Sequence, residues 1–290
     1  MEGLVYKKIA NHFGVKTKDG DYLAVARGNL KQDGIFVGDK VTINVVNNQP
    51  TIEEVHQRKN ILVRPPLANL DQLIIVLAQV PAPDFMIVDK LILFSLCYGI
   101  EPVIVINKKD IDKSLGKYVL NTYKNVVKHI LFTNAITGDG LEDLKKIMKN
   151  KLSAFAGQSA VGKSALVNKI MAKHLSEVGE ISIKNQKGKN TTRHCEIFFE
   201  DNILITDTAG FTSLDEKLLP VSYFELPYYY PDFVQFLNNC KYKSCLHIGE
   251  NECDCAVKRA VYDGLVDKER YLRYKEIYKI LYSKWVRTHG

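Results

Sequence analysis

The sequence predicts a multidomain protein with an N-terminal all-β barrel, a central α/β domain and a C-terminal helical domain. Short apolar runs separated by turn residues fill residues 1–64, strands and helices alternate through residues 65–218, and cysteines cluster within residues 219–290. We therefore place the domain boundaries after residues 64 and 218. A chain of 290 residues is long enough for two or three domains with cores of their own.

The N-terminal segment has the pattern of a small antiparallel barrel. Apolar and polar residues alternate over 22–26, 41–46 and 51–55, and turn formers separate these runs, as in Asp19-Gly20-Asp21 and in residues 47–50. This pattern alone fits an SH3-like barrel as well as an OB-fold.

In the central segment, β and α patterns alternate at short spacing. Such alternation implies parallel strands joined by right-handed crossovers, and hence a doubly wound sheet. The expected strands are 72–80, 103–106, 129–133, 152–156 and 202–206, and the expected helices are 86–97, 117–128, 141–149 and 165–173.

A phosphate-binding loop lies between the strand expected at 152–156 and the helix that follows it. Residues 157–164 fit G-x-x-x-x-G-K-[ST] in the strand–loop–helix context that this motif requires. The backbone amides surround phosphate at the helix N-terminus, Lys163 reaches the β/γ oxygens and the Ser164 hydroxyl ligates Mg²⁺. The expected phosphate-binding residues are Gly157, Gln158, Ser159, Ala160, Val161, Gly162, Lys163, Ser164 and Ala165.

A second motif selects the base. Asn107-Lys108-Lys109-Asp110 follows the strand at 103–106, at the sheet edge where ligands bind in α/β proteins. A carboxylate such as Asp110 can accept from both N1–H and the exocyclic amino group of guanine, whereas adenine lacks that donor pair. The motif therefore favours GTP and argues against an ATP-using kinase.

Asp207-Thr208-Ala209-Gly210 fits D-x-x-G after the strand at 202–206. In P-loop enzymes the Asp holds Mg²⁺ through water and the Gly amide binds the γ-phosphate. Phe211 occupies the next position, where Ras-like enzymes have a Gln that orients the attacking water, and a phenyl ring cannot form that hydrogen bond.

The order of these motifs is permuted. The guanine motif precedes the phosphate-binding loop, and no second N-K-x-D follows it. In this order the chain resembles the ribosome small-subunit-dependent GTPase A family (RsgA, the YjeQ/YloQ type) over nearly its whole length. Residues 27–30, 37–41 and 58–62 resemble short sequence motifs of the family's first domain, and this resemblance favours the OB-fold.

The resemblance implies further site residues. Asn134 and Ala135 stand in the loop that contacts guanine, mainly through its backbone, with Asn134 where Ser is usual. Thr191-Thr192 resembles the family's switch segment, and we favour Thr192 as a Mg²⁺ ligand; Asn190 departs from the family's usual His. The expected catalytic residues are Lys163, Ser164, Thr192, Asp207 and Gly210, and the expected magnesium ligands are Ser164 and Thr192.

The C-terminal cysteines suggest one structural zinc ion per chain. Cys240, Cys245 and His247 have a spacing suited to tetrahedral zinc. For the fourth ligand, the family's spacing selects Cys253, whereas its E-P-G-C-A-V-K segment resembles Glu252 to Lys258 and selects Cys255, which we prefer. Beyond the cysteines, apolar residues from Val261 through Leu265 to Leu281 have helical spacing with basic residues opposite.

The net charge of +7 leans towards polyanionic partners, and residues 256–290 carry nine Lys/Arg against four acids. We therefore expect this tail to present a contact face. No apolar run approaches the length of a membrane span and the first residues do not form a signal peptide, so we expect a cytoplasmic, monomeric protein with no membrane partner.

The resemblance implies binding to the small ribosomal subunit and its ribosomal RNA, and GTP hydrolysis stimulated by that subunit during its late maturation. The alternative is a nucleotide-gated RNA-binding factor whose hydrolysis is incidental.

Overall fold

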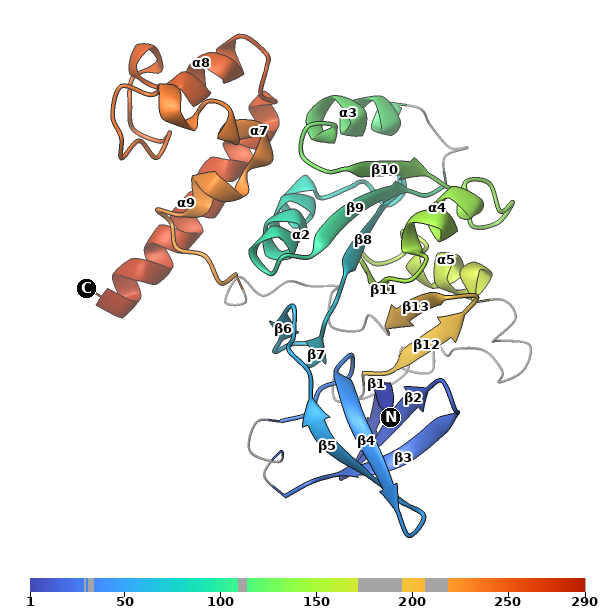
Figure 1. Ribbon diagram of the computed structural model, residues 1–290. Coiled ribbons are helices and arrows are strands. Elements are labelled where there is room, and N and C mark those ends of the chain that lie inside the picture. Colours follow the sequence, from blue (N-terminus) through green and yellow to red (C-terminus); the bar gives the residue numbers. More distant parts are fainter. Residues whose placement is uncertain (29, 31–33, 109–113, 172–194, 207–218, 290) are drawn as a thin grey trace.

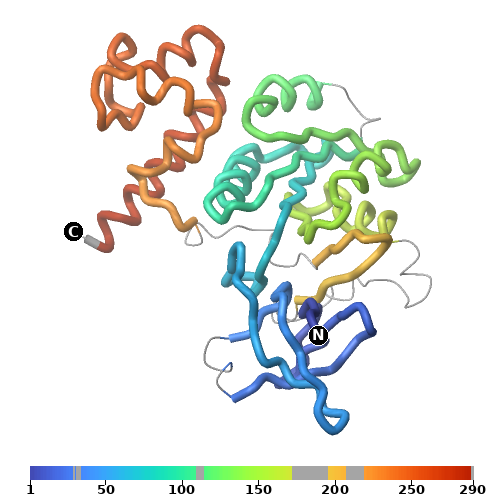
Figure 2. The backbone as a smooth tube through the Cα atoms, in the orientation of Figure 1, coloured from blue at the N-terminus to red at the C-terminus, as the bar shows by residue number. Residues whose placement is uncertain are grey.

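A computed structural model of the chain describes residues 1–28, 30, 34–108, 114–171, 195–206 and 219–289. Three parts follow one another as expected: a β-barrel, an α/β sheet and a C-terminal helical region (Figure 1). The amino terminus lies in the barrel, and the long helix α9 (Lys268–His289) lies beside the α/β part (Figure 2). Among the described helices, none combines the length and the apolar character needed to cross a bilayer.

The first part is a closed five-stranded barrel, in agreement with the expected OB-like fold. The strands join in the order β1-β2-β3-β5-β4, and β4 pairs back onto β1. Inward-facing apolar side chains such as Val15, Ile43 and Ile52 are almost completely buried and form the barrel core. The strands are β1 (Glu2–Ile9), β2 (His12–Thr17), β3 (Asp21–Ala26), β4 (Lys40–Val46) and β5 (Gln49–Val55).

A short hairpin connects the barrel to the sheet. It consists of β6 (Ile61–Leu62) and β7 (Leu67–Ala68). Gly38 has φ +90°, and a Cβ there would lie 2.0 Å from the carbonyl oxygen of Ala68. This close backbone approach requires glycine and fixes the barrel against the hairpin.

A six-stranded sheet forms the centre, in the order β10-β9-β8-β11-β13-β12. All neighbouring strands of this sheet pair in parallel except β12 and β13, which are antiparallel to each other; the parallel pairs agree with the alternating pattern. The strands are β8 (Gln72–Leu77), β9 (Glu101–Ile106), β10 (His129–Phe132), β11 (Leu152–Ala156), β12 (Ile197–Glu200) and β13 (Ile203–Thr206).

Helices cover both faces of this sheet. On one face, α2 (Phe85–Cys97) and α3 (Ser114–Tyr123) share a core with the C-terminal region, and on the other α4 (Leu141–Met148) and α5 (Lys163–Ile170) pack together. α3 ends at Tyr123, five residues earlier than expected, and a further turn follows in which the amides of Val126 and Val127 donate to the carbonyl of Tyr123.

The C-terminal region is built from short helices and one long helix. They are η3 (Leu226–Tyr229), α7 (Pro231–Val234), η4 (Leu237–Asn239), η5 (Glu252–Asp254), α8 (Ala256–Tyr262) and α9 (Lys268–His289). A turn at Gly264, with φ +72°, separates α8 from α9. The helical spacing that included Leu265 is therefore wrong at that residue, which is 62% exposed, whereas Tyr274 and Ile277 of α9 are buried.

Candidate functional site

The predicted nucleotide loops meet at the carboxyl ends of three neighbouring strands. β9 leads into Asn107, β11 leads into Gly157, and β8 lies between these two strands and ends at Leu77. This edge is where α/β sheets bind ligands. The permuted chain therefore brings its guanine motif and its phosphate-binding loop to one edge of the sheet.

The phosphate-binding loop depends on two glycines with positive φ. A Cβ on Gly157 (φ +125°) would lie 2.4 Å from the carbonyl oxygen of Val76, and a Cβ on Gly162 (φ +100°) would lie 2.2 Å from Nδ2 of Asn107. Gly162 caps α5 without a side-chain hydrogen bond to the helix amides. The amides of the first turn are thus available to an anion.

Lys163 folds over this loop. Its Nζ donates to the carbonyl oxygens of Gly157 at 2.8 Å and Gln158 at 2.5 Å. Burial lowers the pKa of the Lys163 ammonium. A phosphate in the loop would supply the negative charge that these neutral carbonyls lack, and would favour the charged lysine.

One buried side chain joins three loops of the site. Nδ2 of Asn107 donates to the carbonyl of Val161 at 3.0 Å. Its Oδ1 accepts from the backbone amide of Ala135 at 3.1 Å and from the hydroxyl of Thr133 at 3.3 Å. Asn107 is 2% exposed, so its primary role here is to hold the guanine motif, the 133–135 loop and the phosphate-binding loop together.

Two more predicted residues shape these loops. Lys108 Nζ donates to the carbonyls of Val80 at 2.9 Å and Ala160 at 3.0 Å, which ties it to the phosphate-binding loop. The side chain of Asn134 accepts from the amides of Ile136 at 2.9 Å and Thr137 at 3.2 Å. The Asn134 side chain therefore closes a turn within the 133–137 loop.

Several predicted site residues fall outside the described part of the chain. They are Lys109, Asp110, Thr192, Asp207 and Gly210. β13 ends at Thr206, directly before Asp207, and pairs in parallel with β11. Their roles remain predictions from the motifs.

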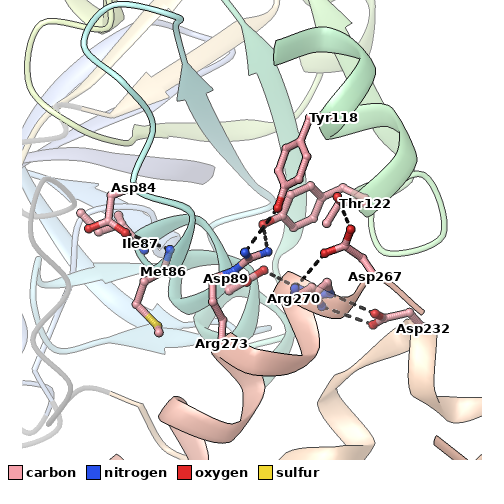
Figure 3. Close-up of polar contacts among 11 residues, drawn as sticks. Asp84, Met86, Ile87, Asp89, Tyr118, Thr122, Asp232, Asp267, Arg270 and Arg273 are labelled. Carbon is pink, nitrogen blue, oxygen red and sulfur yellow. Dashed lines mark hydrogen bonds and ion pairs between the residues drawn. The ribbon is translucent and has the colours of Figure 1, made fainter. Parts of the chain in front are cut away.

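Sequence reasoning missed a contact between the phosphate-binding loop and the start of α2. Oε1 of Gln158 accepts from the backbone amide of Asp84 at 2.8 Å, and its Nε2 donates to the carbonyl of Ala82 at 3.3 Å. Asp84 is also the N-cap of α2, and accepts from the amides of Met86 and Ile87 (Figure 3). An Asp before an apolar helical run signals the cap, but nothing in the motif indicates its bond to Gln158.

A Cys₃His cluster is present in the C-terminal region. The ligand atoms of Cys240, Cys245, His247 and Cys255 all lie within 4.8 Å of one another, whereas Cys253 is exposed and outside the group. Nδ1 of His247 lies 3.7, 3.2 and 3.4 Å from the sulfurs of Cys240, Cys245 and Cys255. Tetrahedral zinc with bonds of about 2.0–2.3 Å separates its ligands by roughly 3.3–3.8 Å, so these residues fit that ion.

The chemistry of the donors also fits a cation. Burial lowers the pKa of His247 to about 4, which leaves a neutral imidazole able to ligate a metal at neutral pH. Burial raises the pKa of the Cys245 and Cys255 thiols, so thiolates here require a nearby positive charge. The amides of Ala256 and Lys258 donate to the sulfurs of Cys240 and Cys255, which supports the charged form of these ligands.

The expected contact face of the tail is partly internal. Arg270 is 1% exposed and Arg273 is mostly buried, and both face α2 and α3. Including them among the surface cations was wrong, because buried carboxylates neutralise them. In the segment before the cysteines, Tyr230 and Phe233 are buried and pack against Tyr274 of α9.

Comparison with known proteins extends these observations. A family model described as RsgA GTPase matches residues 55–217. The chain is 38% identical to the small ribosomal subunit biogenesis GTPase RsgA of Caldanaerobacter subterraneus subsp. tengcongensis, with 100% of this chain and 98% of that protein aligned. It is 34% identical to the protein of the same name in Ruminiclostridium cellulolyticum, over 96% and 93% of the two chains.

Two solved structures resemble the whole chain. YjeQ from Thermotoga maritima superposes with a TM-score of 0.81 at 30% identity, over 97% of this chain and 98% of that one. YloQ, described as a circularly permuted GTPase, superposes with a TM-score of 0.80 at 27% identity, over 98% and 95% of the chains.

Proposed function

The chain belongs to the RsgA GTPase family, and from that premise we propose that it binds GTP and hydrolyses it to GDP and phosphate on the small ribosomal subunit, during late maturation of that subunit. The proposal that the chain binds GTP rests on one observation: the side chain of Asn107, in the guanine motif, donates to the carbonyl of Val161 in the phosphate-binding loop. The ribosomal part rests on the names of the relatives.

At the phosphate end, Lys163 leaves the carbonyls of Gly157 and Gln158 for the β/γ oxygens, and the first amides of α5 donate to phosphate. Ser164 and Thr192 would hold Mg²⁺, which would neutralise charge on the nucleotide when bound. Asp207 would assist in holding that ion, and the Gly210 amide would contact the γ-phosphate.

At the base end, Asp110 accepts from guanine, and the remaining residues shape its pocket. Asn107 and Lys108 hold that pocket against the phosphate-binding loop, as their contacts with Val161 and Ala160 support. Lys109, Asn134 and Ala135 complete it from the flanking loops. These groups bind and orient GTP without covalent chemistry, which matches the needs of phosphoryl transfer.

The Cys₃His cluster would hold one structural zinc ion per chain, with Cys255 as the fourth ligand. Its proposed role is to fix the 240–255 segment beside α9, because Tyr271 and Tyr274 donate to the carbonyls of His247 and Leu246, both at 2.7 Å. Ribosomal RNA is the proposed partner of the barrel and of the exposed basic residues, and we propose that the protein acts as a cytoplasmic monomer.

The deciding experiment is multiple-turnover GTP hydrolysis with and without purified small ribosomal subunits. Intrinsic turnover should be slow, below roughly one per minute, because Phe211 cannot orient water and no arginine finger is identified. Saturating subunits should raise it, each tenfold gain corresponding to about 1.4 kcal/mol of barrier.

Two variants serve as controls. Lys163→Ala should remove both the basal and the stimulated rate, whereas Phe211→Ala should leave nucleotide affinity nearly unchanged. Nucleotide-dependent co-sedimentation with small subunits, combined with no stimulation of hydrolysis, would instead favour the nucleotide-gated RNA-binding factor.

A further inference from the structure

The start of α9 is fixed to the α/β part by a buried ion network of Asp89, Asp232, Arg270 and Arg273 (Figure 3). Asp89, on α2, bonds Arg270 through one carboxylate oxygen and Arg273 through the other. Arg270 also donates to both oxygens of Asp232, at 3.0 and 3.3 Å. The side chains of Asp89 and Arg270 are 0% and 1% exposed, so water does not reach these charges. The two carboxylates and the two guanidinium groups of the network neutralise one another instead.

The same turn of α9 also contacts α3. Asp267 accepts from the amide of Arg270 at 2.8 Å and from the hydroxyl of Thr122 at 3.1 Å, while the guanidinium of Arg273 donates to the hydroxyls of Tyr118 and Tyr123, both at 3.3 Å. A buried charge that loses its partner is costly. The network therefore allows little independent movement of α9 relative to α2 and α3.

Only one turn of α2 separates this network from the phosphate-binding loop. The guanidinium of Arg273 lies 5.5 Å from the ring centroid of Phe85, the first residue of α2. The residue before it, Asp84, caps the helix and donates its amide to Gln158. Asp89, Phe85 and Asp84 thus share a rigid segment that is about 8 Å long at 1.5 Å rise per residue.

We propose that Asp89 and Arg273 are positioning residues for nucleotide binding. They hold the first turn of α2, and α2 holds the side chain of Gln158, so the phosphate-binding loop keeps the shape that receives phosphate. Coupling between two sites is reciprocal. A bound nucleotide must therefore strengthen the packing of α9 against α2 by the same factor. This inference rests on the proposed binding of guanine nucleotide by the loop.

The consequence is a connection between the nucleotide and the C-terminal region that does not pass through the switch segments. Beyond Arg270 and Arg273, α9 carries Tyr271 and Tyr274, whose hydroxyls hold the segment around His247. The geometry therefore links the loop at Gln158 to the Cys₃His cluster through two helices, α2 and α9.

A double-mutant cycle in the full-length chain tests the inference. Of the two proposed positioning residues, Arg273 is the better one to replace. Its side chain lies at the edge of the network, 13% exposed, and its removal leaves Arg270 bonded to Asp89. The variants are Arg273→Gln, Gln158→Ala and their combination, with Arg273→Lys as the conservative change. Lys279→Gln is the matched control, since Lys279 is exposed on the same helix and its ion pair within the described part of the chain is the local one with Glu276.

The measured quantity is the Kd of fluorescent GDP and of a fluorescent non-hydrolysable GTP analogue. Arg273→Gln and Gln158→Ala should each raise Kd about fivefold or more, within the usual range of coupling between sites. The combination should be within about twofold of Gln158→Ala alone, because the path is already broken. Arg273→Lys should lie between wild type and Arg273→Gln, and Lys279→Gln should match wild type.

Amide hydrogen exchange supplies the reciprocal readout, which a merely structural role would not move. GDP should slow exchange across residues 268–281 in the wild-type chain, and this protection should be lost in Gln158→Ala at equal nucleotide occupancy.

Wild-type Kd in Arg273→Gln, full additivity in the double variant, or unchanged exchange in 268–281 on GDP binding would each overturn the inference while leaving the proposed function in place. A wild-type chain that binds no guanine nucleotide would overturn the proposed function, and the inference with it.

Discussion

The side chain of Asn107 donates to the backbone carbonyl of Val161 at 3.0 Å, across 54 residues of sequence. This bond joins the end of β9 to the phosphate-binding loop, two segments whose order in the chain is reversed relative to ordinary small GTPases. The same amide nitrogen lies where a side chain on Gly162 would have to go. Any side chain at position 162 should therefore disturb the bond between Asn107 and Val161.

Gly162→Ala should weaken GDP binding by at least about tenfold, because the new Cβ would displace Asn107 and strain a backbone at φ +100°. Isothermal titration with GDP measures the effect. The control is Gly99→Ala, where φ is +65° but no atom lies within 4 Å of the added Cβ. That variant should lose stability by about 1–2 kcal/mol and keep wild-type affinity. Equal affinities in the two variants would contradict the proposed role of the contact.

Base selection should depend on Asp110. In Asp110→Asn, the amide offers a donor that suits the carbonyl of xanthine, so GTP should bind more weakly and xanthosine triphosphate more tightly. Competition of both nucleotides against a fluorescent GDP analogue measures the change. An unchanged base preference would remove Asp110 from the guanine site.

Purified protein should contain about one zinc ion per chain, measured by elemental mass spectrometry. Cys255→Ser should lose the ion and lower the thermal midpoint, because the remaining buried ligands lose their cation. Cys253→Ser should keep both the ion and the midpoint, since that side chain is exposed outside the cluster. Loss of zinc from the second variant alone would assign the ligand to Cys253.

The barrel depends on a buried ion pair. Arg58 donates to both carboxylate oxygens of Asp39, at 2.7 and 2.8 Å, and Asp39 also accepts from the amide of Phe36 at 2.8 Å. Asp39→Asn should lower the opening free energy of the barrel by about 3–5 kcal/mol, because it removes the charge of a fully buried carboxylate that bonds the guanidinium of Arg58.

Native-state hydrogen exchange of the barrel core amides measures that opening. Asp21→Asn, which breaks the exposed pair with Lys16, should change it by less than about 1 kcal/mol. A similar effect from both variants would show that burial does not decide the strength of the Asp39 pair.

The sequence pattern predicted those elements whose structure depends on residues that are close together in the chain. β8 is buried at every position and its sequence is apolar from Leu73 to Leu77, so its place inside a parallel sheet was readable from sequence. The phosphate-binding loop was equally readable, because the motif specifies its glycines and its lysine. The choice of Cys255 came from the flanking segment that resembles the family's E-P-G-C-A-V-K, since the family's spacing favoured Cys253.

Contacts between distant segments were not readable. Gln158 and Asp84 are 74 residues apart, and Arg270 and Asp89 are 181 apart. An Arg on an amphipathic helix is ordinarily solvated, so the pattern of α9 placed Arg270 on the surface. Only the packing of α9 against α2 reveals the carboxylate that makes its burial possible.

The strand order of the sheet has a consequence for synthesis of the chain. β8 lies between β9, which follows it closely, and β11, which begins 80 residues later at Leu152. As the nascent chain leaves the ribosome, β8, β9 and β10 can pair first, with the other edge of β8 still open. The half that carries the guanine motif can therefore form before the half that carries the phosphate-binding loop exists, and the two motifs meet only after the second half has closed that edge.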